Sequence, residues 1–136
     1  MRCLLTAATL LAVAGLWAPP ALAEDCTDAT QMGLDECAGA AYKKADAELN
    51  QIYGRIVARL AKDASTKAKL VTAQKAWITF RDTECAFRAS AVEGGSMYPM
   101  AMALCLADAT KQRVAELRPL LSCQEGDTTC PVPSSP

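Results

Sequence analysis

The chain contains no histidine, few aromatic residues and no excess of positive charge. Without histidine, Ser-His-Asp or Cys-His catalysis, imidazole-based zinc sites and imidazole pH switches are excluded. Only 5% of the residues are aromatic, which argues against a base-stacking platform. The 14 basic residues are matched by 15 acidic ones, so no nucleic-acid-binding surface is expected. A length of 136 residues suits one domain.

Long apolar runs are missing except near the N-terminus. Arg2 precedes an apolar stretch from Leu4 to Ala18, and after two prolines Ala21-Leu22-Ala23 has the small-x-small spacing of a cleavage site. This stretch is shorter than the about 20 residues that span a bilayer, so an uncleaved anchor is the less favoured alternative. We therefore expect residues 1–23 to be a signal peptide and the mature protein to be periplasmic or secreted, with no membrane span.

Cysteine, by contrast, is abundant, with seven in 136 residues. Removal of the signal peptide also removes Cys3 and leaves an even number, which in an exported chain predicts disulfides. No C-x-x-C motif occurs, so a structural zinc site is not expected. The cysteines that remain are Cys26, Cys37, Cys85, Cys105, Cys123 and Cys130.

Alternating strand patterns are also absent, whereas apolar residues recur at steps of three and four, as in amphipathic helices. The stripe from Leu34 to Leu60 predicts a first helix with Asp28 or Thr30 as candidate cap. A second helix is predicted over about 66–91, capped by Ser65, and a third over about 99–117. The predicted stripe of the second helix consists of Leu70, Ala73, Trp77, Phe80, Glu84 and Phe87.

These patterns predict an all-α fold, a small antiparallel helical bundle of about three main helices stapled by disulfides. Alanine-rich helix faces bury little area, so the disulfides are expected to supply much of the stability. The helical domain is predicted over 24–121. Residues 122–136 are polar and rich in proline, which predicts a flexible tail.

A glycine pair interrupts the helical pattern between the second and third helices. If these helices fold back on each other about Gly94-Gly95, Cys85 and Cys105 face each other, and we predict that they form a disulfide. A Cys26–Cys37 link is feasible because the residues before the first helix can fold back along its first turns. Exclusion then leaves Cys123 to pair with Cys130.

Polar residues accompany the apolar stripes. Gln74, Arg81 and Arg88 follow one another at seven-residue steps beside Trp77. This spacing is compatible with a polar seam inside the bundle or with side chains that extend to solvent, and we expect the latter for Arg88. The predicted polar seam consists of Asn50, Gln74, Arg81 and Arg113.

Several short motifs occur in a specific order along most of the chain. They are Cys26, Thr30-Gln31-Met32, Cys37, Tyr42, Ala45-Asp46, Leu49-Asn50, Tyr53, Gln74-Lys75-Ala76-Trp77-Ile78, Phe80-Arg81-Asp82, Glu84-Cys85, Glu93-Gly94-Gly95-Ser96, Cys105, Thr110, Arg113 and Leu117. This order resembles the LprI-type lysozyme inhibitor family of exported bacterial domains. The family's usual methionine-asparagine step reads Met32-Gly33 here, and Cys123 and Cys130 fall outside its pattern. The resemblance implies an all-helical periplasmic domain, and at least one relative is described as inhibiting lysozyme.

An inhibitor of this kind needs a feature that blocks the lysozyme cleft. Animal lysozymes are basic proteins whose cleft holds two acidic catalytic groups, and a mildly acidic inhibitor is attracted to such an enzyme. A protruding loop with hydrogen-bond donors fits the cleft, and the glycine-containing loop is the candidate, with a plain helix–helix turn as the alternative. The predicted partner-binding residues are Glu93, Gly94, Gly95, Ser96 and Tyr98.

Other function classes were compared with inhibition. A periplasmic interaction module with another envelope partner is the main alternative. A Cu(I) carrier is a further one, because Met97, Met100 and Met102 lie near Cys105 and soft sulfur ligands suit Cu(I). Catalysis by paired carboxylates is not expected, since the acidic residues two positions apart on the helices point in different directions. We expect no enzyme activity, cofactor or metal; the carboxylates concerned are Asp46, Glu48, Asp82 and Glu84.

Overall fold

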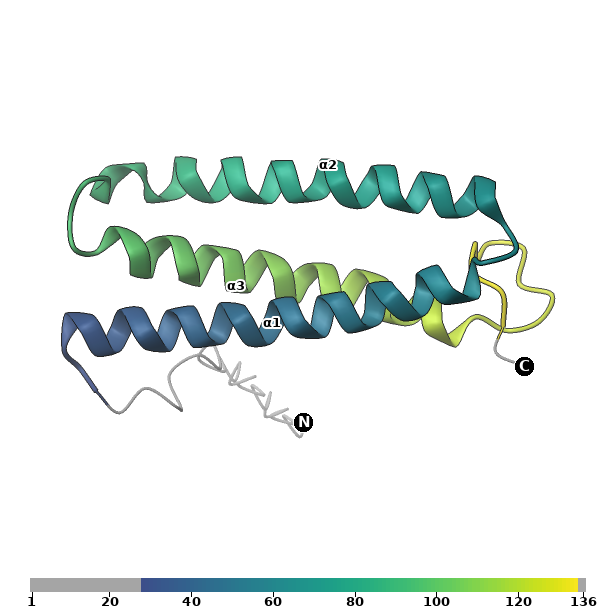
Figure 1. Cartoon of the computed structure of the whole chain (residues 1–136), viewed down its shortest axis with the longest axis horizontal. Helices are drawn as coiled ribbons and strands as arrows, with labels where there is room; N and C mark the ends of the chain where they lie inside the picture. Colours follow the sequence, from purple (N-terminus) through teal and green to yellow (C-terminus); the bar gives the residue numbers. More distant parts are fainter. Residues whose placement is uncertain (1–27, 135–136) are drawn as a thin grey trace, which may run out of the picture.

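The computed structural model describes residues 28–134, which contain three long helices and two short 3-10 segments and no strand. Helix α1 spans Gln31–Arg59, α2 spans Ala64–Ala89 and α3 spans Tyr98–Leu117. The 3-10 segments η1 (Ser90–Val92) and η2 (Arg118–Ser122) follow α2 and α3. The helices lie side by side with α3 between α1 and α2 (Figure 1). The predicted all-α bundle is confirmed.

The central helix α3 packs more closely against α1 than against α2. Buried alanines on both helices, Ala38 and Ala45 of α1 and Ala107 of α3, allow their backbones to approach. Long side chains and a disulfide connect α2 to the other two helices, as described below. Between residues 28 and 134, no helix combines the length and apolar character needed to cross a bilayer.

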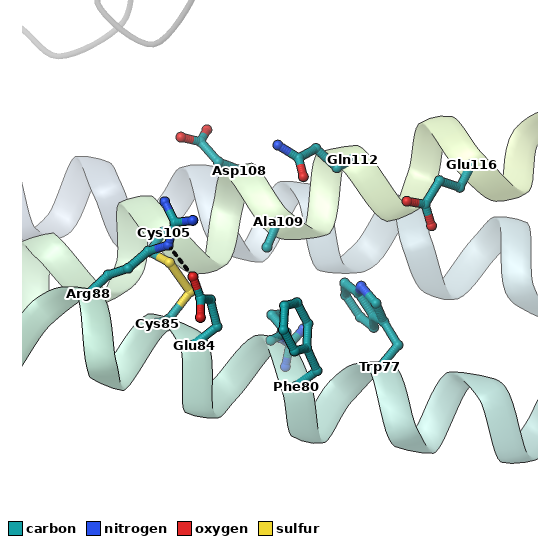
Figure 2. A pocket seen from close by; sticks show the side chains of 11 residues that line it. Trp77, Phe80, Glu84, Cys85, Arg88, Cys105, Asp108, Ala109, Gln112 and Glu116 are labelled. Carbon is teal, nitrogen blue, oxygen red and sulfur yellow. Dashed lines mark hydrogen bonds and ion pairs between the residues drawn. A yellow bond between two sulfur atoms is a disulfide. The ribbon is translucent and has the colours of Figure 1, made fainter.

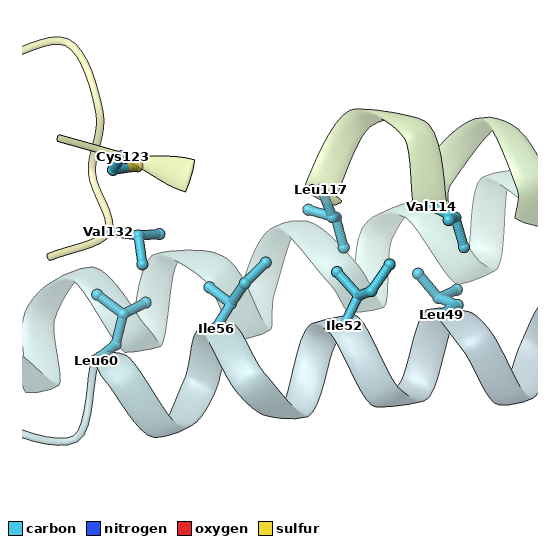
Figure 3. Close-up of a cluster of buried hydrophobic side chains, with 8 residues drawn as sticks. All are labelled: Leu49, Ile52, Ile56, Leu60, Val114, Leu117, Cys123 and Val132. Atoms are coloured by element: carbon cyan, nitrogen blue, oxygen red, sulfur yellow. The ribbon is translucent and has the colours of Figure 1, made fainter. Parts of the chain in front are cut away.

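The aliphatic core lies towards the end of the bundle where α1 meets α2. Large side chains follow one another along the second half of α1 and face α3 and the C-terminal segment (Figure 3). Burial of such side chains supplies the main hydrophobic stabilisation of a small bundle. The cluster consists of Leu49, Ile52, Ile56, Leu60, Val114, Leu117, Cys123 and Val132.

The C-terminal segment, which was predicted to be a flexible tail, contains residues that pack on the bundle. Val132 is buried against the aliphatic core, and Cys123 is joined to Cys130 by a disulfide with a Cα–Cα distance of 5.9 Å. Arg59 of α1 also donates a hydrogen bond of 2.8 Å to the carbonyl oxygen of Leu121. The end of α1 exposes Leu60 unless another segment covers it, and the disulfide-closed turn provides that cover. Composition alone gave no sign of this packing.

Side-chain caps define where α1 and α2 begin. Thr30 accepts a hydrogen bond from the backbone N–H of Gly33 at 3.1 Å, so the Thr30 alternative is the cap of α1. The predicted Ser65 cap of α2 is wrong, because Asp63 accepts from the N–H of Thr66 at 2.9 Å and starts the helix earlier. At the start of α1, a Cβ atom at Gly33 would overlap the Asp28 side chain. Glycine at this position therefore leaves room for the Asp28 side chain.

The Asp63 cap makes part of the stability dependent on pH. The hydrogen bond from the Thr66 backbone N–H lowers the pKa of Asp63 below its ordinary value. A folded-state pKa below the unfolded one stabilises the protein above the unfolded pKa, and this contribution is lost as the pH falls through the folded value. Asparagine caps helices as well as aspartate and does not titrate. We therefore expect D63N to lose less thermal stability than the wild type between roughly pH 5 and pH 3.

Thermal unfolding followed by circular dichroism at several pH values measures this difference. Asp28 and Asp127 have lowered pKa values for the same reason, hydrogen bonds from Thr30 and Thr129, so D63N is expected to keep part of the acid sensitivity. Parallel pH profiles for D63N and the wild type would show that the Asp63 carboxylate does not contribute.

Candidate functional site

The buried face of α2 includes polar residues. It is shifted by one residue towards the C-terminus relative to the predicted apolar stripe. Arg81 and Gln74 are buried, and so is Cys85. Phe80 and Phe87, which were predicted to be buried, are 63% and 74% exposed, so that prediction is wrong. The disulfide from Cys85 to α3 fixes the rotation of α2 about its axis and turns both phenylalanines outwards.

Arg81 connects all three helices at the middle of the bundle. Its guanidinium carbon lies 5.1 Å from the centroid of the Trp77 ring and 5.5 Å from that of Tyr42 on α1. The guanidinium pairs with Asp82 at 2.8 Å and with Asp46 of α1 at 3.9 Å. It also donates to the hydroxyl oxygen of the fully buried Thr110 of α3 at 3.4 Å. These contacts balance the cost of placing a positive charge at only 7% exposure.

A second arginine continues this arrangement along α3. Arg113 donates to the side-chain oxygen of Gln74 at 3.1 Å and pairs with Glu116 at 2.8 Å. Its guanidinium carbon lies 5.7 Å from the Trp77 centroid, so the indole lies near both arginines. The structure thus brings together three of the four residues of the predicted seam, Gln74, Arg81 and Arg113, around Trp77.

Asn50, the fourth residue of the predicted polar seam, lies at the exposed edge of the seam. Asn50 is exposed and donates a hydrogen bond of 2.9 Å to Asp46, which in turn faces Arg81. Arg88 extends to solvent and pairs with Glu84 at 2.7 Å. In the described part of the chain, no buried side-chain nitrogen or oxygen lacks a hydrogen-bond partner. The buried polar atoms of the seam therefore find their partners within the bundle.

The predicted Cys85–Cys105 disulfide is confirmed, with a Cα–Cα distance of 5.6 Å. Cys37 is also disulfide-bonded. Its predicted partner Cys26 lies outside the described residues, as does the predicted signal peptide. Because its sulfur is bonded to Cys85, Cys105 provides no thiolate for the alternative Cu(I) site near Met97, Met100 and Met102. No group of three or more acidic or cysteine side chains suited to a metal ion occurs within residues 28–134.

The loop at residues 93–98 joins η1 to α3 at one end of the bundle (Figure 1). Its residues from 93 to 97 are exposed, and Tyr98 is half-buried at the first position of α3. Gly94 has a φ of 77°, a conformation that favours glycine. The N–H groups of Gly95 and Tyr98 donate within the turn, whereas those of Gly94 and Ser96 have no partner among the described residues. No described side chain caps the N-terminus of α3.

A groove of about 370 Å³ runs between α2 and α3. Trp77 and Phe80 extend from α2 towards α3, and the Cys85–Cys105 bond crosses between the helices beside Glu84 and Arg88 (Figure 2). The α3 side carries polar residues at four-residue steps, namely Asp108, Gln112 and Glu116. These three residues were not predicted to belong to a site, and Phe80 was not predicted to be exposed, although the four-residue spacing is visible in the sequence.

Comparisons with known proteins agree with the fold and the motifs. The family model described as lysozyme inhibitor LprI matches residues 23–117. The chain belongs to the LprI family. An uncharacterized protein of Rhizobium meliloti (strain 1021) is 40% identical over 113 residues, which cover 74% of this chain and 81% of that protein. A solved DUF1311 family protein from Pseudomonas putida KT2440 has a TM-score of 0.61 at 25% identity, covering 66% of this chain and 92% of the other.

Membership of the LprI family indicates a lysozyme-inhibitor-like function rather than an enzymatic one. In this member, the most specific family motif contributes Gln74, Trp77 and Arg81, whose contacts lie inside the bundle. We conclude that this motif maintains the helix arrangement. Among the described residues, the exposed loop and the groove are surface features that a partner can reach.

Proposed function

We propose that this protein is an exported inhibitor that blocks the lysozyme cleft with the loop at residues 93–98. The observation that carries the proposal is the exposed loop in front of the N-terminus of α3, which no described side chain caps. Membership of the LprI family supports a lysozyme as the partner. The Ala21-Leu22-Ala23 cleavage pattern supports export to the periplasm or the medium.

The chemistry of the loop suits a cleft that holds two carboxylates. The N–H groups of Gly94 and Ser96 and the hydroxyl of Ser96 are donors, and charge-assisted hydrogen bonds to a carboxylate are stronger than neutral ones. The N-terminus of α3 adds a partial positive charge directed at the same place. Tyr98 provides an aromatic anchor of the type found at binding hot spots, and Glu93 is placed to meet basic residues at the rim of the cleft.

Replacing the side chains of Ser96 and Tyr98 tests the loop. We expect S96A/Y98A to remain folded and to require a roughly tenfold higher concentration for half-inhibition of lysozyme, because a donor and an aromatic anchor are lost. The measurement is the rate of clearing of a bacterial cell-wall suspension at a series of inhibitor concentrations, using the oxidised mature protein.

Ser65→Ala is the matched control, since Ser65 is exposed at the start of α2, at the opposite end of the bundle. Its inhibition curve is expected to overlay that of the wild type. A folded S96A/Y98A variant with wild-type inhibition would rule out the loop as the blocking element. Absence of inhibition by the wild type itself would contradict the proposed function and favour an interaction module with another envelope partner.

A further inference from the structure

The groove between α2 and α3 combines exposed aromatic surface with charges of both signs, since Arg81 and Arg88 line it beside Glu84, Asp108 and Glu116. Phe80 on one wall is 63% exposed, and Phe87 continues the same face of α2 two turns further on at 74% exposure. The opposite wall presents Asp108 and Glu116. Neither phenylalanine belongs to the aliphatic core, whose members come from α1, α3 and the C-terminal segment. Apolar surface of this kind, next to polar residues, is typical of an interaction site.

The charges of the groove define the chemistry of its partner. Arg81 pairs with Asp82 and Asp46, Arg88 with Glu84, and Glu116 with Arg113, so among the described residues Asp108 is the charged side chain of the lining that forms no ion pair. A lysine or arginine side chain of a partner suits both walls of the groove. Its charged end can pair with Asp108, while its aliphatic stem or its cationic group packs on the Phe80 ring.

The groove also lies close to the loop that is proposed to enter the lysozyme cleft. Phe80 precedes Glu93 by thirteen residues, so at 1.5 Å per residue this wall of the groove lies within about 20 Å of the loop. A small globular domain is about 30 Å across. A single partner of lysozyme size that takes up the loop can therefore cover the groove as well.

We infer that the groove is a second contact site for the same basic lysozyme, holding a lysine or arginine of the enzyme's surface between Phe80 and Asp108. This inference rests on the proposed function. The loop blocks the cleft, and the groove adds affinity without contributing to the block. Loss of the groove contact is therefore expected to weaken binding while complete inhibition is still reached at saturation.

Binding and inhibition measured on the same variants distinguish the two contacts. The groove variants are F80S and D108N, both at exposed positions, and the probe is a basic lysozyme of animal origin bound to a biosensor surface. We expect the dissociation constant to rise by roughly tenfold in F80S/D108N, with complete inhibition still reached at saturation. D108N is expected to slow association and to reduce the dependence of binding on salt, because it removes a steering charge.

Matched controls lie outside the groove lining. Ile78→Ser removes a partly exposed apolar side chain of α2, and Glu125→Gln removes one negative charge near the C-terminus. Both are expected to bind within a factor of about two of the wild type. Wild-type affinity in F80S/D108N, or equal weakening in the controls, overturns the groove contact and leaves the loop proposal intact. Absence of binding by the wild-type protein overturns both.

Discussion

Replacing Arg81 with alanine is expected to lower the free energy of unfolding by about 3 kcal/mol. The variant loses stacking against Trp77 and Tyr42 and leaves the buried hydroxyl of Thr110 without its arginine partner. It also removes the side chain through which α2 contacts Tyr42 and Asp46 of α1. Asp46 and Asp82 are partly exposed, so their carboxylates recover hydration and add little to the loss.

Urea unfolding followed by Trp77 fluorescence and by circular dichroism measures this change. Arg88→Ala is the matched control on the same helix, because Arg88 is 67% exposed and forms only a surface pair with Glu84. We expect that control to lose less than about 0.5 kcal/mol. Equal stabilities of the Arg81 and Arg88 variants would show that the seam does not hold the helices together.

Removing the Cys85–Cys105 disulfide is the second change with a large expected effect. The bond closes a loop over a sequence separation of 20 residues, and C85A/C105A is expected to lose about 3 kcal/mol on the chain-entropy model. The effect is expected to concentrate on α2, because α2 packs less closely on α3 than α1 does. Hydrogen exchange of the α2 amides, measured with thermal unfolding, tests both the size and the location of the loss.

The Cys123–Cys130 disulfide provides the comparison. It closes a separation of only seven residues, so C123A/C130A is expected to lose about 2 kcal/mol and to leave the α2 amides protected. Faster exchange throughout all three helices in C85A/C105A, rather than mainly in α2, would contradict the idea that this disulfide specifically retains α2.

The pairing of residues between α2 and α3 could be predicted from local features of the sequence. The glycine turn placed Cys85 opposite Cys105, and the same register places Arg81 beside Thr110 and Trp77 beside Arg113. The turn position is encoded locally, because Gly94 adopts a positive φ that other residues disfavour. Once that point is fixed, the rise of 1.5 Å per residue determines which residues of two antiparallel helices face each other.

The predictions that differ from the structure depend on contacts between segments that are distant in the sequence. The hydrophobic pattern predicted that Phe80 and Phe87 are buried and left open whether Arg81 lies in a seam or extends to solvent. Periodicity alone cannot show which of two adjacent stripes on a helix contacts a partner helix. Val132 lies in a proline-rich stretch that resembles a disordered tail, and only the exposed end of α1 explains its burial. Propensity reports local preference, and tertiary packing overrides it at such positions.

The sequence by itself determined the helices, the register of the α2–α3 hairpin with its disulfide, and the LprI family, because these follow from residue spacing along the chain. Only the tertiary structure decided that the family motif lies inside the bundle, that the C-terminal segment covers the aliphatic core, and that α2 turns two phenylalanines and a groove outwards. The physical reason is that burial depends on what each surface meets, and a helix can bury a charged face when neighbouring helices supply rings, carboxylates and hydroxyls to receive it.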